Sequence, residues 1–483
     1  LAAGTYNLTA GVDLGFRAIT VRSESGKAVT VVNGQGSVRC FHLRNGLAKV
    51  VGLTIRNGKA TASDNGYRYG GGVYCEGGGQ VVDCIVENCE ANFGGGIRIH
   101  TLGIVDNCII RNNSSTLLSG FGAGGGIHAY LGGDVSDTLI YGNTAAGSGG
   151  GIKFREGGEI ACSSVYNNTA AVYGGGIYCH NGGNAVECDV YGNTAAYGGG
   201  VRSFSQTGTA PEVRQCRIHN NSTTTGSGGG VQIAYGGLLE NSLVYDNLAG
   251  ANGGGISLRE GGSVHSCTVA HNSTTDTDGN GAGDGFGGGI YTSGGGSIRN
   301  TIIFWNSSEA TQNINTPGTG VSYEYCLTYP KPTGNGNIFG TPEFVDIASR
   351  NYYLKASSPC IDTGTSSGAP TEDFTGYRRP LDGKDDGVVD QEYDIGAYEY
   401  KETDDADRDG LPTYWELLYG LDPASTNGND GANGDPDGDF LFNFEEYENG
   451  IYTGSNPQLQ DTDGDGITDF DEVYGRYPST ALG

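Results

Sequence analysis

An apolar residue behind a glycine triplet recurs along most of the chain. The triplets end every 24 to 34 residues, at Gly72, Gly96, Gly126, Gly151, Gly176, Gly200, Gly230, Gly255 and Gly289. The next residue is always Ile or Val, and polar or aromatic residues then alternate with apolar ones, as in Ile177-Tyr178-Cys179-His180. A period of two predicts a β-strand with one buried face. The near-constant spacing of the triplets predicts a stack of repeats.

Two further short apolar stretches, a small residue and an asparagine complete each repeat. The asparagine stands seventeen positions after the triplet, at Asn113, Asn143, Asn168, Asn193, Asn247, Asn272 and Asn306. Asn221 fits the same pattern if an insertion near residues 207–211 is looped out. Asn tolerates the left-handed backbone conformation, and stacked Asn side chains hydrogen-bond along a repeat axis.

The pattern predicts an all-β fold, a right-handed parallel β-helix with three strands per coil. Roughly twenty-five residues suffice for one such coil, and successive coils pair at about 4.8 Å. No long segment has the 3.6-residue apolar period of a helix. A disordered Gly-rich linker is the alternative, but linkers do not keep apolar residues in register.

Changes in pattern divide the chain. The β-helix is expected over residues 1–310, with irregular coils over 1–69 and regular coils over 70–310. Residues 311–400 lack the triplet and are expected to form terminal coils and a cap. Residues 401–483 are strongly acidic and are expected to form a separate module. The first coil shows no covering element, and an open parallel edge invites pairing with another chain.

Composition narrows the function. The 483 residues include 27 Lys and Arg against 55 Asp and Glu, a net charge of −28. This charge argues against nucleic acid and against anionic membranes as partners. No apolar stretch is long enough to span a bilayer. Twelve cysteines indicate an oxidising, extracellular compartment.

Several cysteines share one position in the repeat. Cys84, Cys108, Cys188, Cys216 and Cys267 stand where other coils carry Thr138, Ser163, Ser242 or Thr301. Two coils carry a second cysteine in their first strand. We therefore predict disulfides Cys75–Cys84 and Cys179–Cys188 within coils. The alternative is that these cysteines are buried free thiols, which pack as small apolar side chains.

The acidic end carries three copies of a calcium-loop pattern. Its oxygen ligands stand at positions 1, 3, 5, 9 and 12, with Gly at position 6. The matching residues are Asp405, Asp407, Asp409 and Glu416; Asp435, Asp437, Asp439, Asn443 and Glu446; and Asp461, Asp463, Asp465, Asp469 and Glu472. The middle copy has Phe440 in place of Gly, so its loop geometry is in question. We predict that the module binds Ca²⁺.

An acidic disordered tail is the alternative for this module. The apolar residues Leu411, Trp415, Leu417 and Leu418 favour instead a folded helix that leaves the first loop.

Basic and aromatic residues gather on the predicted outward face of the strand behind each triplet. They are Arg98, His100, His128, Tyr130, Lys153, Arg155, Tyr178, His180 and Arg202. Such a row suits an extended acidic polysaccharide, because aromatic groups cover sugars and basic groups meet carboxylates. In a polysaccharide lyase, Lys153, Arg155 and His180 would be the candidate bases. The alternative is an ordinary solvated face, since outward positions are commonly polar.

Several stretches resemble known bacterial families. The runs Ser358-Pro359-Cys360-Ile361-Asp362 and Asp394-Ile395-Gly396-Ala397-Tyr398-Glu399-Tyr400 resemble the terminal part of choice-of-anchor Q proteins. The coils that pair the triplet with a trailing Asn resemble polymorphic outer-membrane protein repeats, and the acidic loops resemble EF-hand-like loops and thrombospondin type 3 repeats. This resemblance implies an exported or cell-surface β-helix and implies no particular reaction.

We therefore predict a secreted or cell-surface structural or adhesive protein that assembles head-to-tail into a filament or surface layer stabilised by Ca²⁺. The alternative is an enzyme or binding protein for acidic polysaccharides. The absence of a paired-carboxylate or lyase signature favours a role without catalysis.

Overall fold

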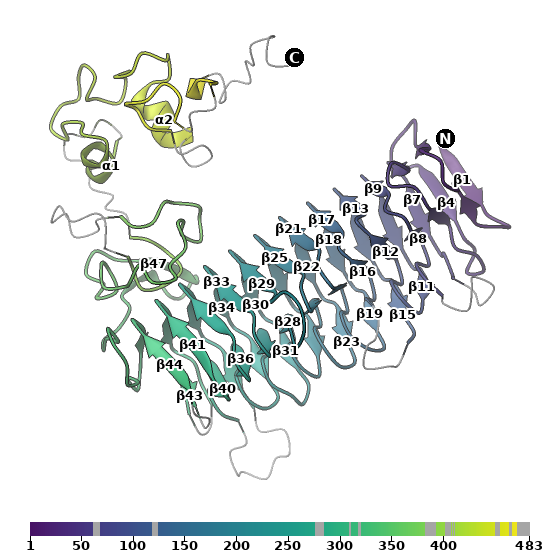
Figure 1. The fold of residues 1–483 in the computed structure, drawn as a ribbon, viewed down its shortest axis with the longest axis horizontal. Helices are drawn as coiled ribbons and strands as arrows, with labels where there is room; N and C mark the ends of the chain where they lie inside the picture. The colour runs from purple at the N-terminus through teal and green to yellow at the C-terminus, as the bar shows by residue number, and fades with distance from the viewer. Residues whose placement is uncertain are drawn as a thin grey trace. The chain divides into compact units, whose positions relative to one another are not determined.

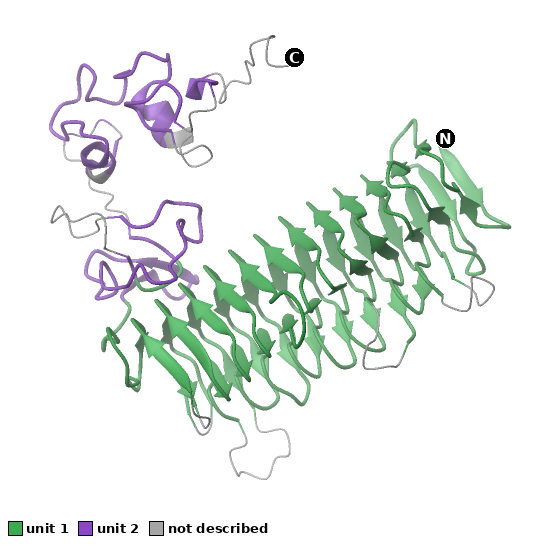
Figure 2. Ribbon diagram, viewed as in Figure 1, with its two compact units in different colours: residues 1–342, 395–397 green, residues 343–394, 398–483 purple. Residues whose placement is uncertain are grey.

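The computed structural model describes most of the chain. The described residues are 1–60, 68–117, 124–275, 285–308, 311–316, 320–381, 393–400, 407, 409, 411–449, 455–462 and 466–470. They fall into two compact units, residues 1–342 with 395–397 and residues 343–394 with 398–483 (Figure 2). The two units are considered separately below.

The first unit is a parallel β-helix (Figure 1). Its strands form sheets of 13, 12, 12 and 8 strands in the described residues, and every strand pairs with its counterpart in the next coil. The predicted β-helix is confirmed. A fourth sheet of two-residue strands joins the three predicted ones.

Sheet A contains β1 (Gly4–Asn7), β4 (Thr30–Asn33), β7 (Thr54–Arg56), β10 (Ile85–Glu87), β14 (Ile109–Arg111), β18 (Leu139–Tyr141), β22 (Ser164–Tyr166), β26 (Asp189–Tyr191), β30 (Arg217–His219), β34 (Leu243–Tyr245), β38 (Thr268–Ala270), β42 (Ile302–Phe304) and β45 (Leu327–Thr328). Sheet B, which follows the triplets, contains β2 (Val12–Asp13), β5 (Phe41–Leu43), β8 (Val73–Cys75), β12 (Ile97–Thr101), β16 (Ile127–Leu131), β20 (Ile152–Arg155), β24 (Ile177–His180), β28 (Val201–Phe204), β32 (Val231–Ala234), β36 (Ile256–Arg259), β40 (Ile290–Ser293) and β43 (Ile314–Asn315).

Sheet C contains β3 (Thr20–Arg22), β6 (Lys49–Val51), β9 (Gln80–Val82), β13 (Ile104–Asp106), β17 (Asp134–Ser136), β21 (Glu159–Ala161), β25 (Asn184–Val186), β29 (Glu212–Arg214), β33 (Leu238–Glu240), β37 (Ser263–His265), β41 (Gly296–Arg299) and β44 (Val321–Glu324). Sheet D contains β11 (Glu90–Ala91), β15 (Ser114–Ser115), β19 (Thr144–Ala145), β23 (Thr169–Ala170), β27 (Thr194–Ala195), β31 (Ser222–Thr223), β35 (Leu248–Ala249) and β39 (Ser273–Thr274). The coils thus continue past residue 310, to β45.

The core is a stack of aliphatic columns. In the coil of β24, Ile177 and Val190 are fully buried, and Ile152 and Val165 hold the same places one coil earlier. Each three-residue strand of sheets A and C buries chiefly its middle residue, as the period of two requires. Because the register repeats from coil to coil, aliphatic residues stack on aliphatic residues in these two columns.

A ladder of buried asparagines runs along one corner of the stack. The Oδ1 atom of Asn193 accepts hydrogen bonds from the backbone N–H and the Nδ2 of Asn168, both at 3.0 Å. Its own Nδ2 donates to Val165 O at 2.8 Å and to Asn221 Oδ1 at 2.9 Å. The same contacts join Asn113, Asn143, Asn168, Asn193, Asn221, Asn247, Asn272, Asn306 and Asn313. Asn221 therefore fits as predicted, with the insertion looped out.

The ladder explains the glycine triplet. Gly174 has φ of +60°, which favours glycine. A Cβ on Gly175 would lie 2.4 Å from Gly199 O, and one on Gly176 would lie 2.9 Å from Asn193 Nδ2. The triplets of neighbouring coils and the ladder thus occupy the space that any side chain would need.

A second buried column contains the small residues twelve after each triplet. In it the Sγ of Cys188 donates to Val186 O at 3.2 Å, as the hydroxyl of Ser163 does to Ala161 O at 2.7 Å. All twelve cysteines are free thiols. The predicted disulfides Cys75–Cys84 and Cys179–Cys188 are therefore wrong. Each thiol of this column is aimed at a backbone carbonyl, which is the role of Ser or Thr in other coils.

The second unit contains little regular structure. Its described elements are the antiparallel pair β46 (Phe344–Asp346) and β47 (Asn351–Leu354), and helices α1 (Thr413–Leu418) and α2 (Asn443–Asn449). Arg379 and Glu399 form a fully buried ion pair at 2.9 Å. A small core of Leu411, Trp415, Leu421 and Ala432 holds the acidic module together. The described residues contain no helix long and apolar enough to cross a membrane.

Replacing one rung of the ladder tests its contribution. Asn193→Ala leaves the buried N–H of Asn168 and Val165 O without their side-chain partners, so we expect a loss of about 3 kcal/mol in the free energy of unfolding. Urea denaturation followed by circular dichroism measures it. Asn167→Asp is the matched control, because this neighbouring Asn is exposed and has φ of +53°. Equal stabilities for the two variants would contradict a structural role for the ladder.

Candidate functional site

Two places in the described chain gather chemistry-bearing side chains: the acidic loops of the second unit and the outer face of sheet B. Four of the predicted metal ligands, Asp405, Asp463, Asp465 and Glu472, lie outside the described residues. The other ten are described and can be placed.

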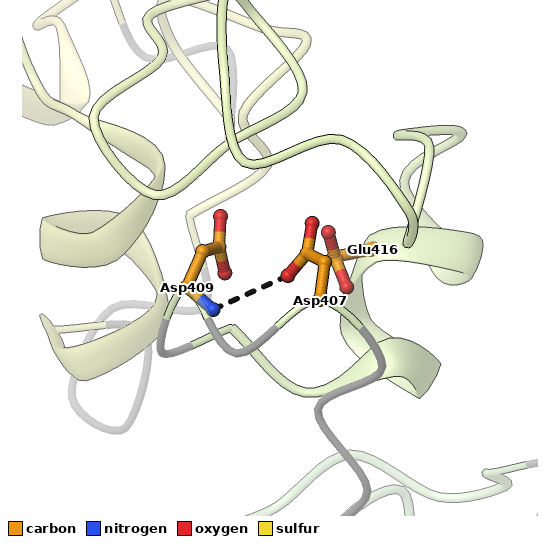
Figure 3. Close-up of side chains that lie close together, drawn as sticks. All are labelled: Asp407, Asp409 and Glu416. Carbon is orange, nitrogen blue, oxygen red and sulfur yellow. Dashed lines mark hydrogen bonds between the residues drawn. The ribbon is translucent and has the colours of Figure 1, made fainter.

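The first loop brings three carboxylates together. Asp407, Asp409 and Glu416 each offer an oxygen atom within 4.8 Å of the others (Figure 3). Asp407 and Asp409 precede the helix α1, and Glu416 lies on it, which confirms the predicted helix after the loop. Asp409 also accepts hydrogen bonds from the backbone N–H of Leu411 at 2.9 Å and of Ala432 at 2.6 Å. The loop is thereby fixed to the segment that leads into the middle copy.

The middle loop has the expected geometry despite its missing glycine. Phe440 adopts φ of +81°, the conformation that Gly would supply at position 6. Asp435 Oδ2 accepts the backbone N–H of Phe440 at 3.2 Å, and Asp461 Oδ2 in the third loop accepts that of Gly466 at 2.7 Å. Phe440 therefore holds the backbone conformation that Gly has at position 6, and its ring is 75 % exposed.

Glu446 is buried among the other carboxylates of the middle loop. It is 1 % exposed, and neither of its carboxylate oxygens has a hydrogen-bond partner in the described structure. Burial, followed by the charges of Asp437, Asp439, Asp469 and Asp435, raises the pKa of Glu446 to about 9. Asn443 is also buried, and its Oδ1 has no partner in the same part of the chain. The middle loop therefore holds three buried oxygen atoms, from Glu446 and Asn443, that have no hydrogen-bond partner in the described residues.

The third loop contributes to the middle one. Asp469 accepts the N–H and the hydroxyl of Thr462 at 2.9 and 2.7 Å. Burial raises the pKa of Asp439 and of Glu446, and the charge of Asp469 adds to both shifts. The backbone N–H of Phe470 donates to Asp439 Oδ2 at 3.0 Å. Sequence spacing assigned Asp469 to the third loop alone, because spacing cannot show how successive loops pack.

These ligand sets suit a hard divalent cation. All donors are carboxylate or amide oxygens, which Ca²⁺ prefers. Clustered carboxylates repel one another, and the repulsion grows as the site is buried. A bound cation would neutralise Asp435, Asp437, Asp439 and Glu446 together. The buried, unpartnered oxygens of Glu446 and Asn443 show that these residues fit such an ion.

On sheet B, the structure separates the nine predicted face residues into two columns. Arg98, His128, Lys153, Tyr178 and Arg202 are each 1 to 6 % exposed. Rings that immediately precede the triplets lie close to this column. The Arg98 guanidinium lies 5.2 Å from the Tyr69 ring and 5.7 Å from the Phe93 ring, and that of Arg202 lies 4.1 Å from the Tyr173 ring. The predicted outward face is therefore not open at these five residues, because they are buried under neighbouring side chains.

The sequence carries a signal for the rings that cover the first column. An aromatic residue stands directly before the triplet at Tyr69, Phe93, Tyr173, Tyr197 and Phe286. Tyr69 bridges to Phe93 in the next coil, and Tyr173 bridges to Tyr197. Their recurrence was the signal that the first outward column is covered.

The second column stays accessible. His100 stacks on Tyr130 with ring centroids 5.4 Å apart, and His180 stacks on Phe204 at 5.1 Å. Arg155 lies between these pairs, with its guanidinium 5.1 Å from the Tyr130 ring. We call His100, Tyr130, Arg155, His180 and Phe204 the stacked strip.

Burial and neighbouring cations depress the basicity of this region. The pKa of Lys153 falls to about 7, through burial and then through Arg155 and Arg98. The pKa of His180 falls to about 4, through burial and then through Lys153 and Arg155, and that of His128 falls well below its usual value. Both histidines are therefore neutral at neutral pH. Lys153 is 1 % exposed, so of the three candidate lyase bases only Arg155 and His180 are accessible.

Comparison with known proteins found a family repeat and a similar solved structure. Residues 163–180 match the Chlamydia polymorphic membrane protein (Chlamydia_PMP) repeat, a stretch that contains Asn168 and the triplet ending at Gly176. The crystal structure of pectate lyase Pel9A is similar at 10 % sequence identity over 83 % of this chain and 86 % of that chain, with a TM-score of 0.29. No curated protein matches the chain significantly.

Phe440 offers a test of the middle loop. A non-glycine residue in the left-handed conformation carries a backbone cost of about 1 kcal/mol. We expect Phe440→Gly to raise the apparent affinity of the acidic module for Ca²⁺ by up to about fivefold, because the loop then reaches its binding conformation without strain. Titration followed by Trp415 fluorescence measures it, and Phe442→Gly, at an exposed position outside the turn, is the control. Lower affinity for Phe440→Gly would contradict the assigned loop geometry.

Proposed function

We propose that the protein is a secreted or cell-surface structural protein, a β-helical shaft that carries a calcium-binding module. The match of one coil to a polymorphic membrane protein repeat supports the surface location. The net charge of −28 disfavours nucleic acid as a ligand. The single observation that carries the calcium proposal is Glu446, whose buried carboxylate faces four aspartates and has no partner in the described chain.

The shaft supplies stiffness. Sheets A, B and C join successive coils along the stack, and sheet D and the asparagine ladder add hydrogen bonds from β11 and from Asn113 onward. Bending would therefore break several hydrogen bonds at once. An extended stack of this kind suits a mechanical or adhesive role at a cell surface. Calcium would order the acidic module by neutralising carboxylates that otherwise repel one another.

Calcium binding is tested on the full chain stripped with EDTA. Isothermal titration is expected to show Ca²⁺ binding that Mg²⁺ does not match, because a loop of many protein oxygens suits the larger ion. Glu446→Gln should weaken binding at the middle loop at least about tenfold, since it removes a charged ligand. Glu445→Gln is the control, because Glu445 accepts the N–H of Phe442 at 3.1 Å and the amide preserves an acceptor. Undetectable binding, or equal effects of both variants, would refute the proposal.

Head-to-tail assembly is the second part of the proposal. Parallel strands of successive coils pair in register throughout the described shaft. A head-to-tail contact between two such shafts that does not close would produce a fibre.

Electron microscopy tests assembly. With Ca²⁺ present we expect filaments or sheets, and after EDTA treatment shorter particles, because the acidic module then loses its order. Glu446→Gln in Ca²⁺ should resemble the EDTA sample, and Glu445→Gln should resemble the wild type. Dispersed particles of one size under every condition would contradict assembly.

A further inference from the structure

We propose that the stacked strip on sheet B binds an acidic polysaccharide, with Arg155 contacting a sugar carboxylate. This inference goes beyond the structural role proposed above and does not depend on calcium. It rests on three observations: the strip is accessible, it carries polar atoms that no described residue engages, and buried cations lie behind it.

The strip is continuous along the β-helix axis. Arg155 pairs in register with His180, and His180 with Phe204, each on the adjacent strand. Neighbouring coils lie about 4.8 Å apart, so one side chain follows another at the pitch of the sheet. The rings of His100 and Tyr130, and those of His180 and Phe204, stack nearly parallel to one another. An extended chain lying along the axis would meet these groups in succession.

Arg155 is the accessible cation of the strip. Its side chain is 39 % exposed, and its contacts are the Tyr130 ring at 5.1 Å and Glu156 Oε1, 3.4 Å from its Nε. The guanidinium donates no hydrogen bond to a described residue. A carboxylate can take two parallel hydrogen bonds from such a fork, which single hydroxyl groups cannot do.

The neighbouring polar atoms suit sugar hydroxyls. Neither the Tyr130 hydroxyl nor the His180 Nε2 makes a hydrogen bond within the described structure. His180 is neutral at neutral pH, so its ring offers one donor and one acceptor. Tyr130 and His180 flank Arg155 on the two adjacent coils, so the polar groups of one extended chain could meet all three side chains.

The charge behind the strip favours an anion. Arg98 is buried beside Arg155 and stays charged, and Lys153, whose pKa is about 7, is charged in part at neutral pH. After burial, both charges lower the pKa of His128. The Arg98 guanidinium lies 5.2 Å from Tyr69 and 5.2 Å from Tyr130, so its charge rests against aromatic rings. An aromatic ring offsets a cation less completely than a carboxylate does. The region therefore stays attractive to anions on an otherwise acidic protein, whose overall charge disfavours nucleic acid.

The test measures binding of polygalacturonate to the full chain by affinity electrophoresis in EDTA, so that calcium plays no part. Binding is expected, and it should fall with added salt. Arg155→Gln should weaken it roughly tenfold through loss of a charge-assisted pair. Arg259→Gln is the matched control, because Arg259 stands in the same column of sheet B and is 58 % exposed. Its Nε lies 3.5 Å from Glu260 Oε1, and no described aromatic ring lies against its guanidinium. Glu156→Gln should tighten binding, since it removes the competing carboxylate.

Other polysaccharides and variants show whether binding depends on the sugar carboxylates or on negative charge in general. Methyl-esterified polygalacturonate lacks the charge and should bind at least about tenfold more weakly. Equal binding of dextran sulfate or single-stranded DNA would show a general polyanion surface and would overturn the proposal. Tyr130→Phe should weaken binding and Tyr130→Ala should weaken it further, with thermal unfolding used to confirm that both fold.

No binding of polygalacturonate, or equal losses for Arg155→Gln and Arg259→Gln, would also overturn it. The Glu446→Gln variant should bind polygalacturonate as the wild type does. Failure of the polysaccharide site and failure of the calcium site are therefore distinguishable.

Discussion

The stacking of one coil on the next in strict register is the constraint on which the structure depends. Backbone hydrogen bonds in four sheets supply most of the contact, and the asparagine ladder satisfies the backbone groups at the corner where the chain turns. Asn193 both receives from the preceding coil and donates to the following one, so no rung is independent of its neighbours. The glycine triplet is a consequence of this packing, because a Cβ at Gly175 or Gly176 would collide with the next triplet or with the ladder.

Register also explains how a basic column can be buried on an acidic protein. Each outward residue of sheet B lies directly above its counterpart, and the aromatic residue before the triplet recurs at the same place. Arg98 and Arg202 thus meet tyrosine and phenylalanine rings. Ring faces attract cations, most strongly where water is excluded. The same arrangement leaves Arg155 and its neighbours at the surface, backed by positive charge.

Much of this could be predicted from sequence, for a physical reason. A β-helix repeats one local environment, so triplet, aliphatic residue and asparagine recur at fixed offsets, and Asn221 could be placed despite its insertion. The loop spacing likewise brought Asp407, Asp409 and Glu416 together. Features that depend on contacts between repeats are harder to predict from the sequence. Cys75 and Cys84 lie in the same coil but form no disulfide. The Cys84 thiol instead donates to Val82 O, as the Ser hydroxyl does in the same column of other coils. Lys153 lies 4.9 Å from the ring of Tyr178 in the next coil, and Asp469 acts on a neighbouring loop.

Hydrogen exchange of the backbone amides tests the central claim most directly. If the ladder closes the corner of every coil, the amides of Asn168, Asn193 and Asn221, each bonded to an Asn side chain in the next coil, should be among the slowest to exchange. The exposed insertion at residues 206–210 should exchange fast. Asparagine amides that exchange as fast as that insertion would contradict the account.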